Sequence, residues 1–367
     1  MRLLRVGFAC LLCAAVLALP GAAFAARRAP APGGDDKDKP PFKAAILIEA
    51  DSGQVLEEQN ADEKLVPASI VKMMVMLVVA EAVGKGVHKL DEAVITSAAA
   101  SKIGGSQVYL KQGEKFSLGE LLKTVSVVSA NDSSHAIAEH VAGSTQAFVQ
   151  LMNERAKQLG MKTTLYHSVH GLPPGPGEQA DYTTARDTAI LAREIVKHPM
   201  LLKWTATVKD TFRGGQFGLL NTNNRLLRTF QGMDGIKTGY YGEAGFNLCA
   251  TAMRGNLRLI SVVLGSPKRP IRDRETSRLL LQGFRLYKKE VLFAQVKELD
   301  KPIPVQGSKK KATVLRPEGT VSVLVKRLEA PQAKIRLKLS NPLQAPLAKG
   351  QKVGEIEDVL VDQVIAK

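Results

Sequence analysis

The stretch that decides the fold is PASIVKMMVMLVVAEAVG, residues 67–84. A proline at its start and a glycine at its end are typical boundaries of an α-helix. The residues between them are apolar on every side, which predicts a helix buried in the core of a globular protein. The run is too short to span a bilayer. We therefore expect a core helix that begins near Ser69.

Two polar residues stand at the start of this run. Ser69 and Lys72 are three residues apart, so in a helix they share one face about a turn apart. A lysine buried without a charged partner is costly, and burial lowers the pKa of its amine. Such an amine can accept the proton of a neighbouring hydroxyl, which makes Ser69 a candidate nucleophile and Lys72 a candidate base. The alternative is a core helix whose lysine side chain extends to the surface.

A second motif, Ser129-Ala130-Asn131, falls between two helical patterns. The first pattern starts with a capping box made by Ser117 and Glu120, and the second ends at Gly143. A polar turn between two helices can direct a hydroxyl and an amide into a cleft. Serine and asparagine are also simply favourable turn residues, and this motif alone does not separate the two interpretations.

A third motif, Lys237-Thr238-Gly239, leads into a sheet. Asp234-Gly235 before it predicts a turn, and after it Phe246–Met253 and Leu257–Leu264 predict a hairpin of two buried strands. We expect the motif on the first strand of that sheet. A lysine and a hydroxyl there can bind a substrate carboxylate, while strand amides polarise a carbonyl. The alternative is a solvated strand end.

Taken together, the three motifs resemble those of the penicillin-recognising serine acyltransferases. They are most similar to the D-alanyl-D-alanine carboxypeptidases of peptidase family S11, which are low-molecular-weight penicillin-binding proteins. The resemblance covers residues 43–290 well and the rest to residue 367 more loosely. Ala130 stands where glycine is usual, and Tyr240 where histidine is common. The other similar segments are His170-Gly171-Leu172, Tyr182–Asp187, Asn221-Thr222-Asn223, Asp234–Gly239 and Ala244–Leu248.

The order of helix and strand signals predicts an α+β fold. Helix signals dominate residues 69–200, with strands on either side at 43–57 and 246–264 and a further helix through Leu279–Leu286. This order predicts an antiparallel sheet covered by helices, with an all-helical cluster inserted between its first and later strands. The resemblance implies the same serine β-lactamase/DD-peptidase-like catalytic domain, which we place at residues 43–290.

The last part of the chain, residues 291–367, changes to short alternating segments. In residues 334–339 the apolar side chains occupy one face and the basic ones the other. This pattern predicts a small all-β sandwich domain, which the resemblance also implies.

The first 42 residues predict an exported protein. Two arginines and an apolar run precede Ala23-Phe24-Ala25, so residues 1–25 form a predicted secretory signal peptide. Residues 26–42, rich in Pro, Gly, Asp and Lys, predict a flexible linker. Removal of the signal leaves Cys249 as the single cysteine, so we expect no intramolecular disulfide.

No metal or cofactor is expected from the motifs. His167 and His170 are three residues apart and could be ligands, but no acidic or cysteine partner stands at ligand spacing. The chain contains neither a G-x-S-x-G nor an H-E-x-x-H motif. We interpret the remaining histidines as structural or exposed.

The charge and the C-terminal residues bear on partners and location. A net charge of +16 on an exported protein favours anionic lipid, wall polymers or peptidoglycan carboxylates. An aromatic content of 5% gives little support for the stacking platforms that bind single-stranded nucleic acid, so we expect no nucleic-acid partner. No segment after residue 340 contains Trp, Phe or Tyr, so we expect no amphipathic membrane anchor there. The protein is expected in the periplasm or envelope space, with at most weak, salt-sensitive contact with anionic membrane.

The resemblance implies a reaction and a role for each site residue. Ser69 attacks the penultimate D-alanine carbonyl of a peptidoglycan stem peptide, with Lys72 as general base and no cofactor. β-Lactams acylate the same serine. The other implied roles are proton transfer to the leaving amine by Ser129, substrate binding and orientation of Lys72 by Asn131, an oxyanion hole from the amides of Ser69 and Tyr240, and carboxylate binding by Lys237, Thr238 and Gly239 with help from Arg274.

Three alternatives remain from the sequence. A peptidoglycan DD-endopeptidase uses the same residues, and only its products distinguish it. A class A β-lactamase normally has Ser-Asp-Asn and a deacylating glutamate in an E-x-x-L-N segment, and neither occurs between Asn131 and Lys237. A non-catalytic wall-binding protein has no reason to keep all the polar groups of the three motifs.

Overall fold

The computed structural model describes residues 41–293, 302–309, 312–316, 318, 320–328, 333–339, 342–360 and 363–366. The predicted signal peptide, residues 1–25, and nearly all of the predicted linker, residues 26–42, lie outside these residues.

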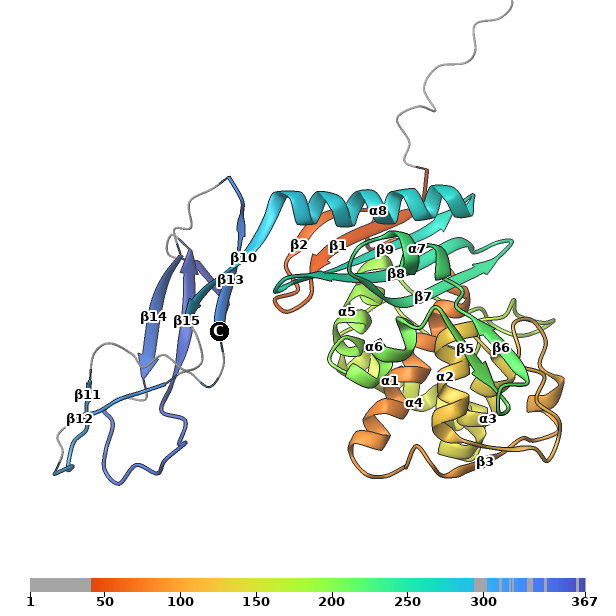
Figure 1. Ribbon diagram of the computed structural model, residues 1–367, viewed down its shortest axis with the longest axis horizontal. Helices are drawn as coiled ribbons and strands as arrows, with labels where there is room; N and C mark the ends of the chain where they lie inside the picture. The colour runs from red at the N-terminus through yellow and green to blue at the C-terminus, as the bar shows by residue number, and fades with distance from the viewer. Residues whose placement is uncertain are drawn as a thin grey trace, which may run out of the picture. The chain divides into compact units, whose positions relative to one another are not determined.

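A five-stranded antiparallel sheet in the order β2-β1-β9-β8-β7 forms the centre of the first domain (Figure 1). The chain thus places its first two described strands beside three strands that come some 170 residues later, and β7 becomes an edge. The strands are β1 (Ala44–Glu49), β2 (Val55–Gln59), β7 (Met233–Tyr241), β8 (Gly245–Arg254) and β9 (Leu257–Ser266).

Apolar residues line both faces of this sheet. In β1, Ile46 and Ile48 join the larger core, whereas Ala45 and Leu47 join a second core on the opposite face. This alternation follows from the two-residue period of a strand. Burial of both faces explains why the inner strands β1, β9 and β8 are mostly apolar, whereas the edge strand β2 is mostly exposed and polar. The predicted hairpin is confirmed, because β8 and β9 are joined by two residues, the first of which is Gly255 with φ of 59°.

Helices cover the two faces, as Figure 1 shows. Helix α8 (Arg269–Leu286) packs Leu279, Leu280 and Phe284 on one face, and the inserted cluster covers the other. The insertion between β2 and β7 contains η1 (Ala68–Val71), α1 (Lys72–Gly84), β3 (Ala93–Ile95), η2 (Ala100–Lys102), β4 (Lys115–Ser117), α2 (Leu118–Val128), α3 (Asn131–Ala142), α4 (Thr145–Gln158), α5 (Ala185–Ile195), α6 (Pro199–Thr205), β5 (Lys209–Phe212), β6 (Phe217–Leu220) and α7 (Asn224–Thr229).

The predicted core helix is present and buried. It is preceded by the 3₁₀ turn η1, so α1 itself begins at Lys72 rather than at Ser69. The predicted capping box also exists: the Ser117 hydroxyl accepts from the Glu120 N–H, and the Glu120 carboxylate accepts from the Ser117 N–H. These local signals position the helices that carry the first two motifs.

The C-terminal part is rich in strands, and its described residues contain no helix after α8. The chain is therefore an α+β domain followed by a β-rich domain. All pairings between named strands in this part are antiparallel: β10 (Tyr287–Phe293) with β13 (Val321–Lys326), β11 (Ile303–Pro304) with β12 (Ala312–Thr313), and β15 (Gly354–Leu360) with both β14 (Ala333–Leu339) and β16 (Gln363–Ala366).

Candidate active site

The first motif places a lysine amine against a serine hydroxyl. Lys72 Nζ lies 3.0 Å from Ser69 Oγ and donates a second hydrogen bond of 2.6 Å to the His170 carbonyl. The Lys72 side chain is fully buried, while Ser69 is half-buried and accessible. Ala68, just before the serine, has φ of 50°, a left-handed conformation that is uncommon outside glycine. Backbone strain of this kind is often found at functional sites.

The environment of Lys72 favours its neutral form. Burial lowers the pKa of Lys72 well below 10.5, and the nearby charge of Lys237 lowers it further. Asp181 and Asp132 act in the opposite direction but do not overcome the loss of hydration. This direction agrees with the expectation from burial, and a neutral amine at this position suits a proton acceptor for Ser69.

The second motif presents two polar atoms that lack partners. Ser129 ends α2 in the left-handed region, with φ of 65°, and Asn131 begins α3. Asn131 Nδ2 donates to the Gly104 carbonyl at 2.7 Å. Its Oδ1 and the Ser129 Oγ are buried and have no hydrogen-bond partner among the described residues. An unpaired buried polar group costs about 1–3 kcal/mol, so both atoms suit a ligand that supplies the missing partners.

The third motif lies on the edge strand β7. Lys237 is buried and its Nζ donates to the Thr238 carbonyl at 2.9 Å, while the Thr238 hydroxyl donates to Thr222 Oγ1 at 2.8 Å. Burial, then the nearby charge of Arg272, lowers the pKa of Lys237 to about 7. Among the described residues β7 pairs with one strand only, β8, so its outer edge can pair with an extended peptide.

Two glycines allow separate segments to approach the serine turn. A side chain at Gly239 would place its Cβ 2.5 Å from the Pro67 carbonyl oxygen. Gly171, with φ of 71°, would clash in the same way with the Ala68 carbonyl. Only glycine lets β7 and the 170–171 loop enclose this turn from two sides.

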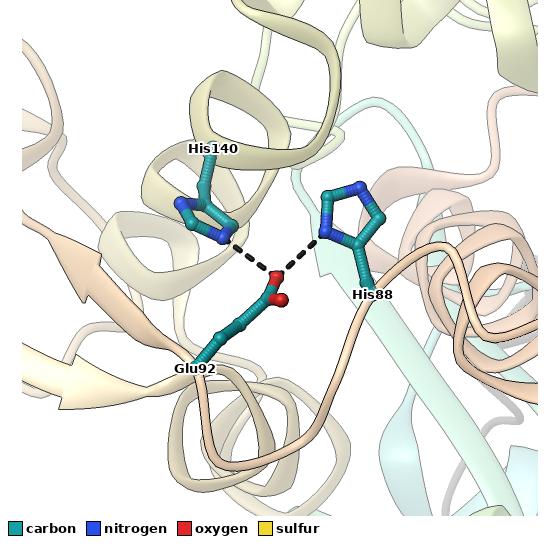
Figure 2. Close-up of side chains that lie close together, drawn as sticks. All are labelled: His88, Glu92 and His140. Atoms are coloured by element: carbon teal, nitrogen blue, oxygen red, sulfur yellow. Dashed lines mark hydrogen bonds and ion pairs between the residues drawn. The ribbon is translucent and has the colours of Figure 1, made fainter.

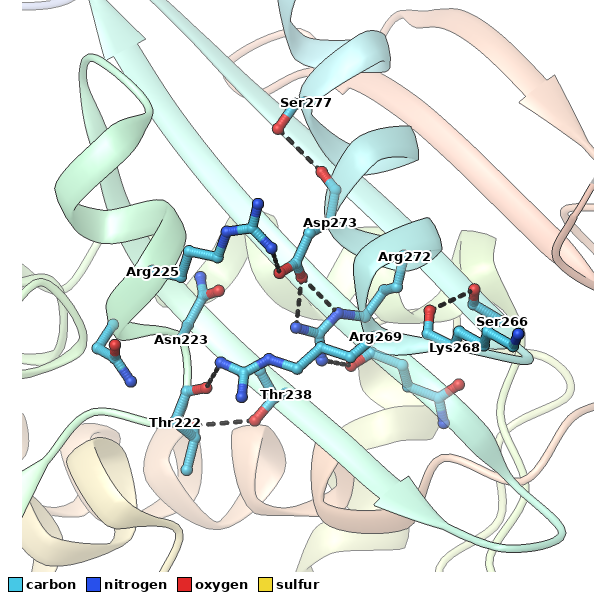
Figure 3. A network of polar contacts seen from close by, with 12 residues as sticks. Thr222, Asn223, Arg225, Thr238, Ser266, Lys268, Arg269, Arg272, Asp273 and Ser277 are labelled. Atoms are coloured by element: carbon cyan, nitrogen blue, oxygen red, sulfur yellow. Dashed lines mark hydrogen bonds and ion pairs between the residues drawn. The ribbon is translucent and has the colours of Figure 1, made fainter.

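Three arginines, Arg225, Arg269 and Arg272, gather near the start of α8 (Figure 3). Arg272 is buried and donates to Asp273 Oδ1 through Nε at 3.0 Å and Nη2 at 2.5 Å. Arg269 is exposed, and its Nη2 lies 3.4 Å from the Thr222 carbonyl oxygen. Positive charge therefore lies close to both Lys237 and the Thr238–Thr222 pair.

The substrate-binding role of Arg274 stays a prediction, and the structure favours a neighbouring arginine. Its side chain is 69% exposed and lies 3.8 Å from Glu275. Positions 272 and 274 are two apart on a helix, about 200° around its axis, so they point in nearly opposite directions. Arg272 rather than Arg274 faces the third motif.

Comparison with known proteins identifies the family. A model of the D-alanyl-D-alanine carboxypeptidase family matches residues 36–268. The chain belongs to this family. A second model, that of the C-terminal domain of penicillin-binding protein 5, matches residues 287–367 of this carboxypeptidase family member.

Relatives and solved structures agree with that assignment. D-alanyl-D-alanine carboxypeptidase DacF of Bacillus subtilis is 38% identical over 318 residues, covering 86% of this chain and 80% of that protein. The crystal structure of penicillin binding protein 5 from Haemophilus influenzae is 31% identical with a TM-score of 0.74, covering 91% of this chain and 96% of that one. Penicillin-binding protein D2 of Listeria monocytogenes, solved in an ampicillin-bound form, is 32% identical with a TM-score of 0.61, covering 67% and 98%.

Within this carboxypeptidase, the sequence did not reveal what holds Lys72. Among the described residues no hydrogen bond joins Asn131 to Lys72, because Lys72 Nζ donates to Ser69 and the His170 carbonyl, and Asn131 Nδ2 donates to Gly104. The orienting role of Asn131 stays a prediction. Any residue type offers a carbonyl, so His170 could be singled out only through the similar segment around it. The lone pair of its ring Nδ1 is already used, because Nδ1 accepts from the Leu172 N–H at 3.2 Å and is not available to a metal ion.

The loop that supplies the His170 carbonyl is held by Asp181. The carboxylate accepts from the His167 and Ser168 N–H groups at 2.6 and 2.9 Å, and from the Ser168 hydroxyl at 2.7 Å. Burial raises the pKa of Asp181, although these hydrogen bonds oppose the effect. Asp181 thus positions the carbonyl that in turn positions Lys72.

Proposed function

We propose that Ser69 is the nucleophile of a serine D-Ala-D-Ala carboxypeptidase that removes the terminal D-alanine from peptidoglycan pentapeptide stems. The observation that carries the proposal is the 3.0 Å contact between Ser69 Oγ and the buried Lys72 amine. The lowered pKa of Lys72 gives that amine the capacity to act as a base.

Acylation starts with transfer of the Ser69 hydroxyl proton to the neutral Lys72 amine. Oγ forms a bond to the carbonyl carbon of the penultimate D-alanine, and the N–H groups of Ser69 and Tyr240 stabilise the oxyanion. The C–N bond then breaks, and the departing amine receives its proton through the Ser129 hydroxyl. Water hydrolyses the resulting ester and regenerates Ser69.

The side of the active site formed by strand β7 binds the substrate. An extended stem peptide pairs with the free edge of β7, and Asn131 Oδ1 accepts from one of its amide N–H groups. Lys237 and Thr238 bind the terminal carboxylate. Gly239 next to them lets strand β7 lie close to Pro67 and the serine turn. The additional positive charge comes from Arg272 and Arg269 instead of Arg274.

β-Lactams acylate the same serine in this proposal. The ampicillin-bound form of the Listeria relative supports it, because that protein covers 67% of this chain at 32% identity. The absence of an E-x-x-L-N segment between Asn131 and Lys237 disfavours the β-lactamase alternative and predicts a long-lived adduct. DD-endopeptidase activity remains a second candidate, since it requires the same groups.

Mass spectrometry of the intact protein tests the assignment. Penicillin should add one acyl group per chain, and diacetyl-lysyl-D-Ala-D-Ala should release D-alanine. Ser69→Ala should abolish both, whereas Ser277→Ala, which removes a hydroxyl bonded to the Asp273 carbonyl on α8, should leave both intact. Circular dichroism checks that each variant folds. An adduct on Ser69→Ala would disprove the role of this serine. Cleavage of cross-linked dimers into monomers, without release of D-alanine from the tripeptide substrate, would instead favour the endopeptidase.

We also propose that the protein acts in the cell envelope after export. Support comes from the predicted signal peptide at residues 1–25 and from the carboxypeptidase family itself. Within the part of the chain that the structure describes, no helix is long and apolar enough to cross a membrane. Cell fractionation at low and high salt distinguishes weak binding to anionic lipid, which salt releases, from an anchor, which only detergent releases.

A further inference from the structure

A cluster of two histidines and a glutamate lies apart from the three motifs (Figure 2). His88 Nδ1 lies 2.6 Å and His140 Nε2 2.7 Å from the same atom, Glu92 Oε1. One potential ligand atom from each side chain lies within 4.8 Å of the other two. Two imidazoles from two segments of the chain thus meet at one carboxylate oxygen.

The backbone around this cluster is held in place. The Lys89 N–H donates to Glu92 Oε2 at 3.0 Å, and the Leu118 N–H donates to the Glu92 carbonyl at 3.0 Å. His140 is fixed in the last turn of α3. Each of the three side chains keeps 18–27% of its surface exposed, so solvent reaches the cluster. A preformed, accessible group of this kind can take up an ion without rearrangement of the fold.

We propose that His88, Glu92 and His140 bind a divalent transition-metal ion, with Zn²⁺ as the best match. Imidazole nitrogen and carboxylate oxygen are zinc ligands, and three protein ligands leave a fourth tetrahedral position for water. With metal–ligand bonds of about 2.0–2.2 Å, tetrahedral ligands stand about 3.3–3.5 Å apart. The two N···O distances would have to widen by less than about 1 Å, which requires only a small rotation of partly exposed side chains.

A second histidine–glutamate pair on α3 provides the contrast. His135 Nε2 lies 3.3 Å from Glu139 Oε1, one turn along the helix, with similar exposure. No third ligand joins that pair among the groups found in the described residues. It has the form of an ordinary (i, i+4) contact, whereas the 88–92–140 cluster joins residues 48 positions apart.

The position of the cluster gives the ion a structural role. Helix α1 begins with Lys72 and α3 begins with Asn131, both of which line the proposed active site. His88 follows the end of α1, and His140 lies near the end of α3. A bound ion therefore ties together the far ends of the two helices whose starts carry catalytic groups. It stabilises their spacing and takes no part in the acyl transfer.

Metal binding to the untagged, chelator-treated protein tests this site. We expect one Zn²⁺ per chain by elemental analysis after dialysis, and a rise in Tm when Zn²⁺ is added. Mg²⁺ should not raise Tm, because it prefers an octahedron of oxygen ligands. Co²⁺ should give the visible absorption of a tetrahedral site. His140→Ala should weaken Zn²⁺ binding by at least about 10–100-fold, because changing a residue that only hydrogen-bonds to a metal ligand already has an effect of that size. His135→Ala should bind like the parent.

Glu92→Gln guards against a folding artefact, because it keeps the size of the side chain and one acceptor oxygen while removing the charged ligand. It should lose the Zn²⁺-dependent rise in Tm while melting as a folded protein. Equal Zn²⁺ affinity in the parent, His140→Ala and Glu92→Gln would overturn the proposal. So would the lack of any Co²⁺ absorption or Tm shift in the parent, which would make the cluster a hydrogen-bonded group only.

Discussion

The two sides of the active site each bury a lysine, yet they hold it differently. On the helical side, Lys72 Nζ contacts the Ser69 hydroxyl, the group it is proposed to deprotonate. On the sheet side, Lys237 Nζ donates to the Thr238 carbonyl of its own strand. Burial lowers the pKa of both amines, that of Lys237 to about 7. A lowered pKa therefore does not by itself identify a base: the neighbouring group decides.

The backbone conformation also differs between the two sides. The helical side places its hydroxyls with two non-glycine residues in the left-handed region, Ala68 and Ser129. The sheet side is a regular edge strand whose Gly239 allows close approach to Pro67. Strained turns fix individual reacting atoms, whereas a regular strand suits an extended peptide. We infer chemistry on the helical side and recognition on the sheet side.

The largest expected effect comes from Lys72→Met, which keeps most of the side-chain volume and removes the amine. Acylation by penicillin should slow by on the order of 10³-fold or more, as for other nucleophile–base units. Stopped-flow or quenched labelling measures the rate, with Ser69→Ala as the zero level and a thermal melt to show that the variant folds. A variant that acylates at nearly the parental rate would eliminate Lys72 as the base.

The pH dependence of the acylation rate should report the folded-state pKa of Lys72. Lys72 accepts a proton only when neutral, so the rate should fall about tenfold per unit once the pH drops below its folded-state pKa. Because burial lowers that pKa, the loss should occur far below pH 10.5. The unfolded chain keeps this proton up to about pH 10.5. Between the folded-state pKa and pH 10.5 the unfolded state therefore binds more protons, so the free energy of unfolding increases as the pH rises through this range. An acid limb located near pH 10.5 would contradict the buried, neutral lysine.

Lys237→Arg should have a smaller effect of a different kind. The charge remains, but the planar guanidinium does not match the position of a buried ammonium. We expect kcat/KM for the D-Ala-D-Ala substrate to fall by roughly 10–100-fold, the value of one charge-assisted hydrogen bond, mainly through KM. A fall in kcat alone, with KM unchanged, would instead place Lys237 in the chemical step and remove the distinction between the two sides.

Gly239→Ala tests the contact between the sides. Its Cβ would lie 2.5 Å from the Pro67 carbonyl oxygen, so β7 must move away from the serine turn. We expect unfolding free energy to fall by about 1–3 kcal/mol, as for overpacked sites. Gly242→Ala is the matched control, because a Cβ at Gly242 has no neighbour within 4 Å. Equal stability of the two variants would show that β7 adapts freely.

Much of this arrangement could be predicted from the sequence, because local signals set it. The proline and glycine around residues 67–84 and the Ser117–Glu120 capping box define helices by chemistry that acts within a few residues. The turn predicted at Asp234-Gly235 was wrong, since both residues belong to β7. The Asp234 carboxylate accepts from Arg258 at 2.7 and 2.8 Å, a partner 24 residues away that overrides the local turn preference.

Features set by distant contacts could not be predicted. The His170 carbonyl that accepts from Lys72 has no side-chain signature. His88 and Glu92 meet His140 only because α1 and α3 end near each other, so their spacing along the chain resembles no common metal motif. Three-dimensional packing, rather than residue type, creates both features.

Arg274→Ala should have the smallest effect, and it completes the comparison. Its exposed side chain contacts only Glu275 at 3.8 Å among the ion pairs found, so kcat/KM and Tm should stay within about twofold and 1–2 °C of the parent. Arg272→Ala should differ sharply, because it leaves the buried Asp273 without its closest partner, a change that costs about 3–5 kcal/mol in comparable pairs. Thermal melts and steady-state kinetics of both variants decide between the two arginines. A loss of substrate binding in Arg274→Ala, with Arg272→Ala unaffected, would show that α8 presents the other face to the bound carboxylate and would support the role predicted for Arg274 from the sequence.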